Sequence, residues 1–252
     1  MVEICGIINI TPDSFSESER LYDGKNIKMD RVLSITEKMI SDGASVIDIG
    51  GESTRPGATE VTDVEEIYRI APVIEKVKEH FNITVSADTY KVSTAKAAIK
   101  AGADIINDIG MMRGDMAKVI AESGKKYVLV HNKENYVNLI DDMQNAVSMA
   151  LRAGIARDNL ILDPGIGFNK SYEQNVAEIR NVEELCKLAY PVLLGVSNKS
   201  VIGNTLNLPV DERLEGTLAV SVYAALKGVK YIRVHDVAAN VRAVRMIERI
   251  ML

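Results

Sequence analysis

The stretch SVIDIGGESTRPGA, residues 45–58, shows the pattern that decides the fold of this 252-residue chain. Its apolar run, SVIDIG, is nearly continuous and leads through two glycines into a polar loop. Nearly continuous apolar runs, rather than alternating ones, are typical of strands in a parallel sheet that helices cover. The loop places Arg55 between Thr54 and Pro56. A plain connecting turn does not need this cation, so the loop is a candidate binding element.

The same order of apolar run, turn and amphipathic segment recurs along the whole chain. Eight such units without a linker or a change in composition predict one (β/α)8 TIM barrel, a single domain over residues 1–252. The apolar runs cover residues 4–9, 45–50, 83–88, 104–109, 127–131, 160–163, 191–196 and 231–235. Five of the segments between them end at a glycine, the residue that best closes a helix: Gly43, Gly102, Gly124, Gly154 and Gly228.

A doubly wound open sheet is the structural alternative to the barrel. That fold would require a G-x-G-x-x-G phosphate-binding fingerprint after the first strand. The corresponding segment, NITPDSFS at residues 9–16, lacks the fingerprint. The barrel is therefore the favoured fold.

The composition restricts the kinds of partner that the chain can have. Hydrophobic residues make up 47% and charged residues 26% of the sequence, and the net charge is −5. This acidic balance argues against nucleic acid or a membrane surface as a partner, and no apolar run approaches the length of a membrane span. The N-terminus shows no secretion signal, and Cys5 and Cys186 show no disulfide or metal pattern. We therefore expect a cytoplasmic protein that binds any anionic ligand through locally gathered cations.

Polar residues follow all eight predicted strands, where a barrel has its active site. A single Asp after a strand is more often a turn residue or a helix cap, as we expect for Asp236, and Asp163 could start a turn at Pro164. Eight such strand ends together indicate a site. The residues at these ends are Asn9, Asp48, Asp88, Asn107, Asp108, His131, Asn132, Asp163, Ser197, Asn198, Lys199, Arg233, His235 and Asp236.

These strand ends divide by charge. Asp88, Asn107 and Asp163 follow strands three, four and six, and their acceptors suit a flat heterocycle with several N–H donors. Lys199 follows strand seven, and Arg233 with His235 ends strand eight, next to strand one and Asn9 in a closed barrel. The loops after strands seven and eight are a frequent phosphate site in TIM barrels. Together with Arg55, these cations predict an anion site.

Eight segments, in order and over nearly the whole chain, resemble the signature segments of bacterial dihydropteroate synthases. They read GIINITPDSFS, IDIGGESTRPGA, SADTYK, GADIINDI, ILDPGIGF, LLGVSNKS, ERLEGTLA and RVHDV. The resemblance implies a transferase of folate biosynthesis. Such an enzyme joins 6-hydroxymethyl-7,8-dihydropterin diphosphate to p-aminobenzoate, forms 7,8-dihydropteroate and releases diphosphate. Loss of diphosphate would give a stabilised pterin-methyl cation that the arylamine attacks.

The resemblance also implies a role for each matching residue, Mg²⁺ as cofactor and a homodimer formed by helices late in the chain. The pterin would contact Asp88, Asn107, Asp163, Lys199 and Arg233. The diphosphate would contact Asn9, Thr54, Arg55, Arg233 and His235, with Asn9 as ligand of Mg²⁺. The p-aminobenzoate would lie near Phe15, Pro56, Ser197 and Lys199. The catalytic residues would be Arg55, Asp88, Lys199, Arg233 and His235.

Four departures from the family pattern bear mainly on the second substrate or on loop closure. Asn198 stands in SNKS where the family has SRKS, and the first loop reads SFSESER instead of SFSDGG. GFNK replaces GFGK, and HNKENYVNL lacks an M-x-G pattern. An enzyme with an altered acceptor, or a non-catalytic pterin-binding homologue, therefore stays open as an alternative. A methyltetrahydrofolate:corrinoid methyltransferase is less favoured, because it has no use for a diphosphate site.

Overall fold

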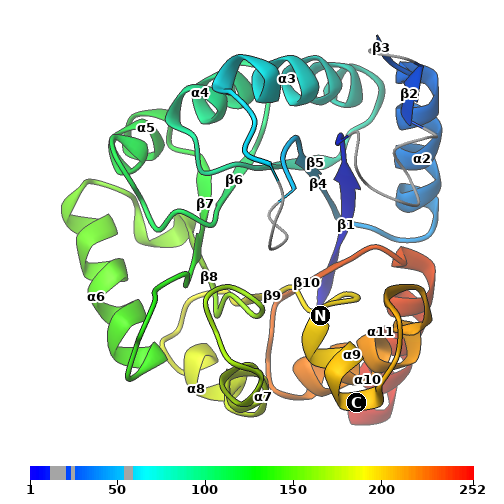
Figure 1. Ribbon diagram of the computed structural model, residues 1–252, viewed down its shortest axis with the longest axis vertical. Coiled ribbons are helices and arrows are strands. Elements are labelled where there is room, and N and C mark those ends of the chain that lie inside the picture. The colour runs from blue at the N-terminus through cyan, green and yellow to red at the C-terminus, as the bar shows by residue number, and fades with distance from the viewer. Residues whose placement is uncertain (12–20, 24–25, 54–58) are drawn as a thin grey trace.

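The computed structural model describes residues 1–11, 21–23, 26–53 and 59–252, and its centre is a closed parallel barrel. Eight parallel strands form one sheet in the order β8-β7-β6-β5-β4-β1-β10-β9. A parallel bridge between Leu162 and Val192 joins the two ends of this sheet, and the Leu162 amide donates to the Pro191 carbonyl at 2.9 Å. The helices form a ring outside the strands (Figure 1). The predicted (β/α)8 barrel is confirmed.

The strands agree with the predicted apolar runs to within a residue at most ends. The strands of the barrel are β1 (Glu3–Asn9), β4 (Val46–Gly50), β5 (Thr84–Asp88), β6 (Ile105–Asp108), β7 (Lys126–Val130), β8 (Leu160–Asp163), β9 (Leu193–Leu194) and β10 (Tyr231–Val234). The exception is the run at residues 191–196, of which only β9 is a strand. Its ladder with β10 has two residue pairs, and a single bridge joins this run to β8. A short antiparallel hairpin, β2 (Tyr22–Asp23) and β3 (Asn26–Ile27), was not predicted.

The helices follow the strands as the amphipathic segments predicted. They are α2 (Met29–Ser41), α3 (Asp63–His80), α4 (Val92–Lys100), α5 (Met116–Ser123), α6 (Leu139–Arg152), α7 (Tyr172–Arg180), α8 (Val182–Cys186), α9 (Ser200–Leu206), α10 (Leu214–Leu226) and α11 (Val237–Met251). Two short 3-10 helices, η1 (Arg157–Asn159) and η2 (Val210–Glu212), precede β8 and α10. The five glycines predicted to close helices all have φ between +63° and +107°, the left-handed region that favours glycine.

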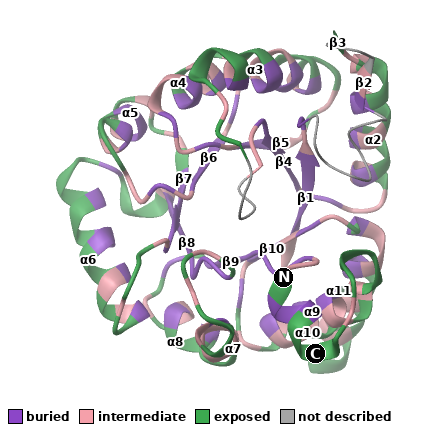
Figure 2. Ribbon diagram, in the orientation of Figure 1, coloured by how far each residue is buried: buried purple, intermediate pink, exposed green. Residues whose placement is uncertain are grey.

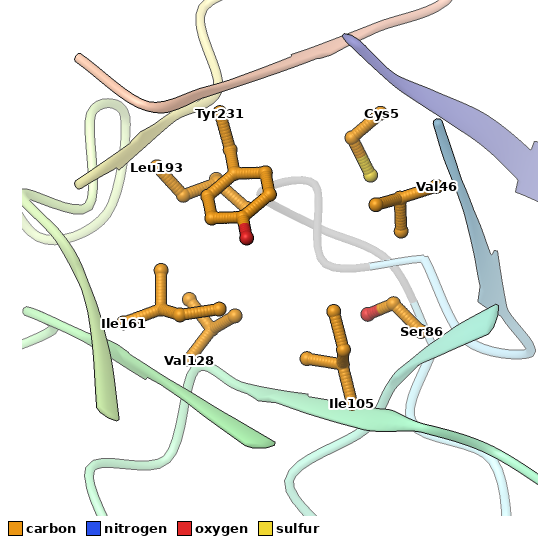
Figure 3. A pocket seen from close by; sticks show the side chains of 8 residues that line it. All are labelled: Cys5, Val46, Ser86, Ile105, Val128, Ile161, Leu193 and Tyr231. Atoms are coloured by element: carbon orange, nitrogen blue, oxygen red, sulfur yellow. The ribbon is translucent and has the colours of Figure 1, made fainter. Parts of the chain in front are cut away.

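The core has two parts, one outside the strands and one inside the barrel. Outward side chains such as Ile47 and Ile49 pack under the helices, whose outer faces are exposed (Figure 2). Inside, one side chain from each strand points to the axis and together they form a floor (Figure 3). The floor leaves a cavity of only about 10 Å³, room for one water molecule at most. Its residues are Cys5, Val46, Ser86, Ile105, Val128, Ile161, Leu193 and Tyr231.

Cys5 and Cys186 are both free, and Cys5 is buried in the floor. In the part of the chain that the structure describes, no helix is both long enough and apolar enough to cross a membrane.

Candidate active site

A polar layer lies directly on the floor, toward the carboxyl ends of the strands. Side chains along a strand alternate between its two faces, so the residue two positions after a floor residue also faces the barrel interior. Asp88 and Asn107 are direct neighbours in this layer, because they pair in the register of β5 with β6. Five strands contribute to the layer: Asp48, Asp88, Asn107, Asp163 and Arg233.

Arg233 lies between two carboxylates of the polar layer. Its Nε donates to Asp48 Oδ2 at 2.6 Å and its Nη2 to Asp88 Oδ2 at 2.5 Å. Burial raises the pKa of the Asp88 carboxyl, and the Arg233 charge opposes that rise. Asp48 is almost fully buried, and its Oδ1 has no hydrogen-bond partner among the described residues. Arg233 therefore holds one buried carboxylate, Asp48, and one half-buried carboxylate, Asp88, in place at the base of the site.

Asn107 and Asp163 present acceptors to the same interior. Asn107 is 4% exposed, and no described residue donates to its Oδ1. Asp163 Oδ1 accepts the Gly165 amide at 2.6 Å. Burial raises the pKa of the Asp163 carboxyl, and the Lys199 charge opposes it. Asp163 thus starts a turn and also faces the interior, so the two interpretations of the sequence are compatible.

Lys199 is the residue before α9, and its side chain extends to the polar layer. Its Nζ donates to the Ile166 carbonyl at 2.5 Å and lies 4.8 Å from the centroid of the Phe168 ring. Burial lowers the pKa of Lys199 to about 8, against the opposing charge of Asp163. The sequence analysis gave no individual role to Ile166 or Phe168, although both belong to the quoted GIGF segment.

Ser197 and His235 meet at the ends of β9 and β10. The Ser197 Oγ lies 2.9 Å from His235 Nδ1 and also accepts the His235 amide at 3.2 Å. The next residue, Asn198, has a positive φ of 57°, a conformation that asparagine tolerates better than most residues. Its amide donates to Thr217 Oγ1 at 3.2 Å. Asp236, as predicted, caps α11 by accepting the Ala239 amide at 2.9 Å.

Asn9 ends β1 and pairs with Gly50 of β4. A Cβ added at Gly50 would be in ordinary van der Waals contact with Asn9 Oδ1, at 3.5 Å, and with Asp88 Oδ2, at 3.8 Å, so both oxygens lie near this glycine. Within residues 1–11, 21–23, 26–53 and 59–252, no three His, Cys, Asp or Glu side chains gather as a metal site. An Mg²⁺ ion often takes one or two protein oxygens and fills its shell with phosphate oxygens and water. Asn9 Oδ1 is a protein oxygen of the kind that such an ion takes.

Four predicted site residues lie outside the described residues. They are Phe15, Thr54, Arg55 and Pro56.

A buried charge cluster joins the segments on either side of residues 54–58. Lys91 Nζ contacts Glu52, donates to the Val61 carbonyl at 2.5 Å and lies 3.6 Å from Glu66 Oε2. The side chains of Glu52, Glu66 and Lys91 are at most 8% exposed. The Tyr90 hydroxyl adds a bond to Glu52 Oε1 at 3.1 Å. Lys91 and Tyr90 lie in the SADTYK segment, to which the sequence analysis assigned only Asp88 as a site residue.

The chain is similar to known proteins over nearly its whole length. The family described as pterin binding enzyme matches residues 5–235. The dihydropteroate synthase of Clostridium beijerinckii is 47% identical over 98% of this chain and 94% of its own length. A dihydropteroate synthase structure from Clostridium difficile, solved with pteroic acid, has a TM-score of 0.91 at 40% identity and covers 99% and 96% of the two chains. That of Xanthomonas albilineans with 4-aminobenzoic acid has a TM-score of 0.91 at 35% identity and covers 99% and 93%.

Proposed function

We propose a division of roles within the site that starts from one premise: this chain belongs to the family of pterin-binding enzymes, and its activity is that of a dihydropteroate synthase. The relatives that share 40% or more of the sequence over nearly its whole length carry this activity in their names. They favour it over a corrinoid methyltransferase and over a binding homologue without activity. The enzyme is a transferase that joins the pterin diphosphate to p-aminobenzoate.

The pterin ring is proposed to bind in the polar layer. Asp88, Asn107 and Asp163 would accept its N–H groups, because carboxylate and amide oxygens are strong acceptors for such an edge. The observation that carries this assignment is the buried Oδ1 of Asn107, to which no described residue donates. A buried acceptor without a partner is costly, so a ligand that donates to it gains affinity. Lys199 and Arg233 would complete the contacts of the ring.

The diphosphate is proposed to bind at the mouth of the barrel, which is its open end at the carboxyl ends of the strands. It would lie on the side of the pterin that faces away from the floor. Arg233 has five N–H donors, and its bonds to Asp48 and Asp88 occupy only two groups, Nε and Nη2. It can therefore hold the carboxylates and still donate to an anion. His235, Asn9, Thr54 and Arg55 would supply the remaining contacts. A cation placed where the leaving group gains charge stabilises the transition state.

Asn9 would hold a Mg²⁺ ion together with oxygens of the diphosphate. When bound, such an ion neutralises negative charge on the leaving group. The positions of Asn9 Oδ1 and Asp88 Oδ2, both near Gly50, support this assignment. Calorimetric titration of diphosphate with and without Mg²⁺ tests it, since Asn9→Ala should remove the gain in affinity that Mg²⁺ gives.

In the reaction, one bond at the pterin methylene carbon breaks and another forms there. The C–O bond to diphosphate breaks and its electron pair leaves with the diphosphate. The lone pair of the arylamine forms the new C–N bond, and the nitrogen releases a proton to water. Asp88 and Asp163 would stabilise positive charge on the pterin as the bond breaks. The p-aminobenzoate would approach along Ser197, Lys199, Phe15 and Pro56, and a relative that binds 4-aminobenzoic acid supports this second substrate.

Two measurements test these assignments. The first incubates the protein with the pterin diphosphate, Mg²⁺ and p-aminobenzoate and follows dihydropteroate and diphosphate together. The second compares binding of a bare pterin to the wild type and to Asn107→Leu, which removes the acceptor at similar volume. We expect a loss of about tenfold or more, because an acceptor of a buried hydrogen bond is removed. Unchanged affinity would overturn the place of Asn107 in the pterin site.

We also propose that residues 1–252 form one domain, that two copies form a homodimer and that the enzyme works in the cytoplasm. Apolar side chains on the two helices late in the chain support the dimer, since Leu226 is 44%, Met246 61% and Ile250 65% exposed. Analytical ultracentrifugation tests it. The free thiols of Cys5 and Cys186 support a reducing compartment.

A further inference from the structure

Lys170 joins the segments that follow β7 and β8. Its Nζ donates to three backbone carbonyls, those of His131 at 3.0 Å, Gly165 at 3.1 Å and Phe168 at 3.2 Å. Three donors are all that an ammonium group has. Burial lowers the pKa of Lys170 to about 8, against the opposing charges of Asp163 and Glu178. This lysine is therefore a half-buried cation whose three donors all have backbone partners.

The carbonyls that Lys170 holds belong to the turn that builds one wall of the active site. Two of them, at Gly165 and Phe168, lie on either side of Ile166, whose carbonyl accepts the bond from Lys199. The Gly165 amide orients the carboxylate of Asp163. Residues 163–168 thus carry one site carboxylate and set the position of the site lysine.

The turn also packs directly on the backbone after β7. Gly165 has a φ of +67°, and a Cβ there would lie 1.9 Å from the His131 carbonyl oxygen. The three carbonyl oxygens that accept from Lys170 Nζ lie close together, and the shared cation offsets their mutual repulsion. A second link lies alongside, because Asn169 Nδ2 donates to Asn132 Oδ1 at 2.7 Å.

We propose that Lys170 is a positioning residue for pterin binding, which holds the 163–168 turn against His131 so that Asp163 and Lys199 are placed for the ring. The inference rests on the proposed roles of Asp163 and Lys199. Lys170 itself touches backbone and not the proposed pterin position. Its effect on the reaction passes through the turn.

Lys170 also acts on Lys199 through its charge. The charged groups that face Lys199 are Asp163 on β8, Arg233 on β10, Asp88 on β5 and Lys170. The two cations lower the pKa of Lys199 and the two carboxylates raise it. Removing the charge at Lys170 should therefore raise the pKa of Lys199, an effect that a merely structural role would not produce.

Two substitutions separate the charge of Lys170 from its geometry. Lys170→Met keeps the length of the side chain and removes the donors and the charge. Lys170→Arg keeps the charge, but a planar guanidinium cannot converge on three carbonyls as an ammonium does. Lys133→Met is the matched control, because this exposed lysine lies near the same strand end and, among the described residues, forms an ion pair with Asp142 alone. Thermal unfolding of each variant checks that it is folded.

The measurements are the KM of both substrates, the pH dependence of kcat/KM and the affinity for a bare pterin. We expect Lys170→Met to raise the KM of the pterin diphosphate about tenfold or more and to weaken the bare pterin similarly. The alkaline limb of its pH profile should move up by about half a pH unit. Lys170→Arg should show the rise in KM without the movement of the limb.

A folded Lys170→Met protein with wild-type KM and wild-type pterin affinity would overturn the inference. So would a Lys133→Met control that shows the same changes. A wild-type protein that forms no dihydropteroate would instead overturn the roles on which the inference rests. The bare-pterin affinities would then still test the turn by themselves.

Discussion

Arg233 and Asp88 are joined across the barrel interior by a hydrogen bond of 2.5 Å, although 145 residues separate them in the chain. The same guanidinium binds Asp48 from its Nε. A carboxylate held by a half-buried arginine stays available as an acceptor. The strength of pterin binding should depend on this arrangement.

Asp88→Asn should weaken binding of a bare pterin by about 10- to 100-fold, because a hydrogen bond to a charged group contributes about 1.5–3 kcal/mol. Fluorescence titration measures the affinity. Asp115→Asn is the control, since Asp115 is exposed and makes no capping bond to α5. Equal losses in both variants would contradict a place for Asp88 in the pterin site.

Lys199 should contribute an alkaline limb near pH 8 to the activity, in the same range in which Lys170 loses its charge. Its pKa is lowered to about 8, so the ammonium form exists below this pH and is lost above it. If binding needs the cation, kcat/KM for the pterin diphosphate should drop about tenfold for each pH unit above 8. Lys199→Arg stays charged and should lose this limb even if its activity is lower. A limb at the same pH in this variant would assign the titration to another group.

Lys91→Met should destabilise the fold by about 3–5 kcal/mol, because it leaves Glu52 and Glu66 buried without their cation. Burial raises the pKa of Glu66 and the Lys91 charge lowers it, so the substitution raises it further. A carboxyl whose pKa is higher in the folded state stabilises the fold at low pH and loses this contribution as the pH rises. The loss of unfolding free energy in Lys91→Met should therefore be smaller at about pH 5 than at about pH 8.

Urea unfolding at both pH values measures this deficit. Lys76→Met is the control, because it removes an exposed lysine from a surface ion pair with Glu79 and should change stability little. A deficit in Lys91→Met that does not depend on pH would show that the cluster acts only by packing.

Asn198→Arg should lower thermal stability and improve the use of p-aminobenzoate. The positive φ at this position costs arginine about 1–2 kcal/mol. Each kcal/mol lost should lower the midpoint temperature of unfolding by about 2–4 °C. A cation beside Ser197 and Lys199 should lower the KM of the anionic p-aminobenzoate a few-fold. Asn198→Ala shares the backbone strain without the cation, so its KM should not fall. An unchanged KM for p-aminobenzoate in Asn198→Arg would show that residue 198 does not affect the use of the second substrate.

The strands, and the polar residues that they place on the inner face of the barrel, could be predicted because their signals are local. Each apolar run ends at a polar residue, and the alternation along a strand puts Asp88, Asn107 and Asp163 on the inner face. The same rule identifies Asp48, which stands two residues after Val46, although its pairing with Arg233 is not visible in the sequence. The shortness of β9 was not predictable either, because it depends on how few pairs the neighbouring strands offer.

The interior lysines illustrate what local patterns do not contain. Lys91 and Lys170 belong to polar segments that read as ordinary loops. Each binds groups that are far away in the chain. Lys91 contacts Glu52, which is 39 residues away, and Lys170 donates to the carbonyl of His131, which is also 39 residues away. Only the packing of several loops against one another decides which lysine is buried.

The floor of eight side chains has a consequence for the order of events. It closes one end of the barrel, so substrates cannot pass through the molecule and the polar layer is reached from the mouth. The pterin occupies the deeper position in the proposed arrangement, and the arylamine lies above it. The pterin diphosphate should accordingly enter first, and a pterin should be unable to exchange while the arylamine covers it. Both substrates should thus enter through the same opening and bind one after the other.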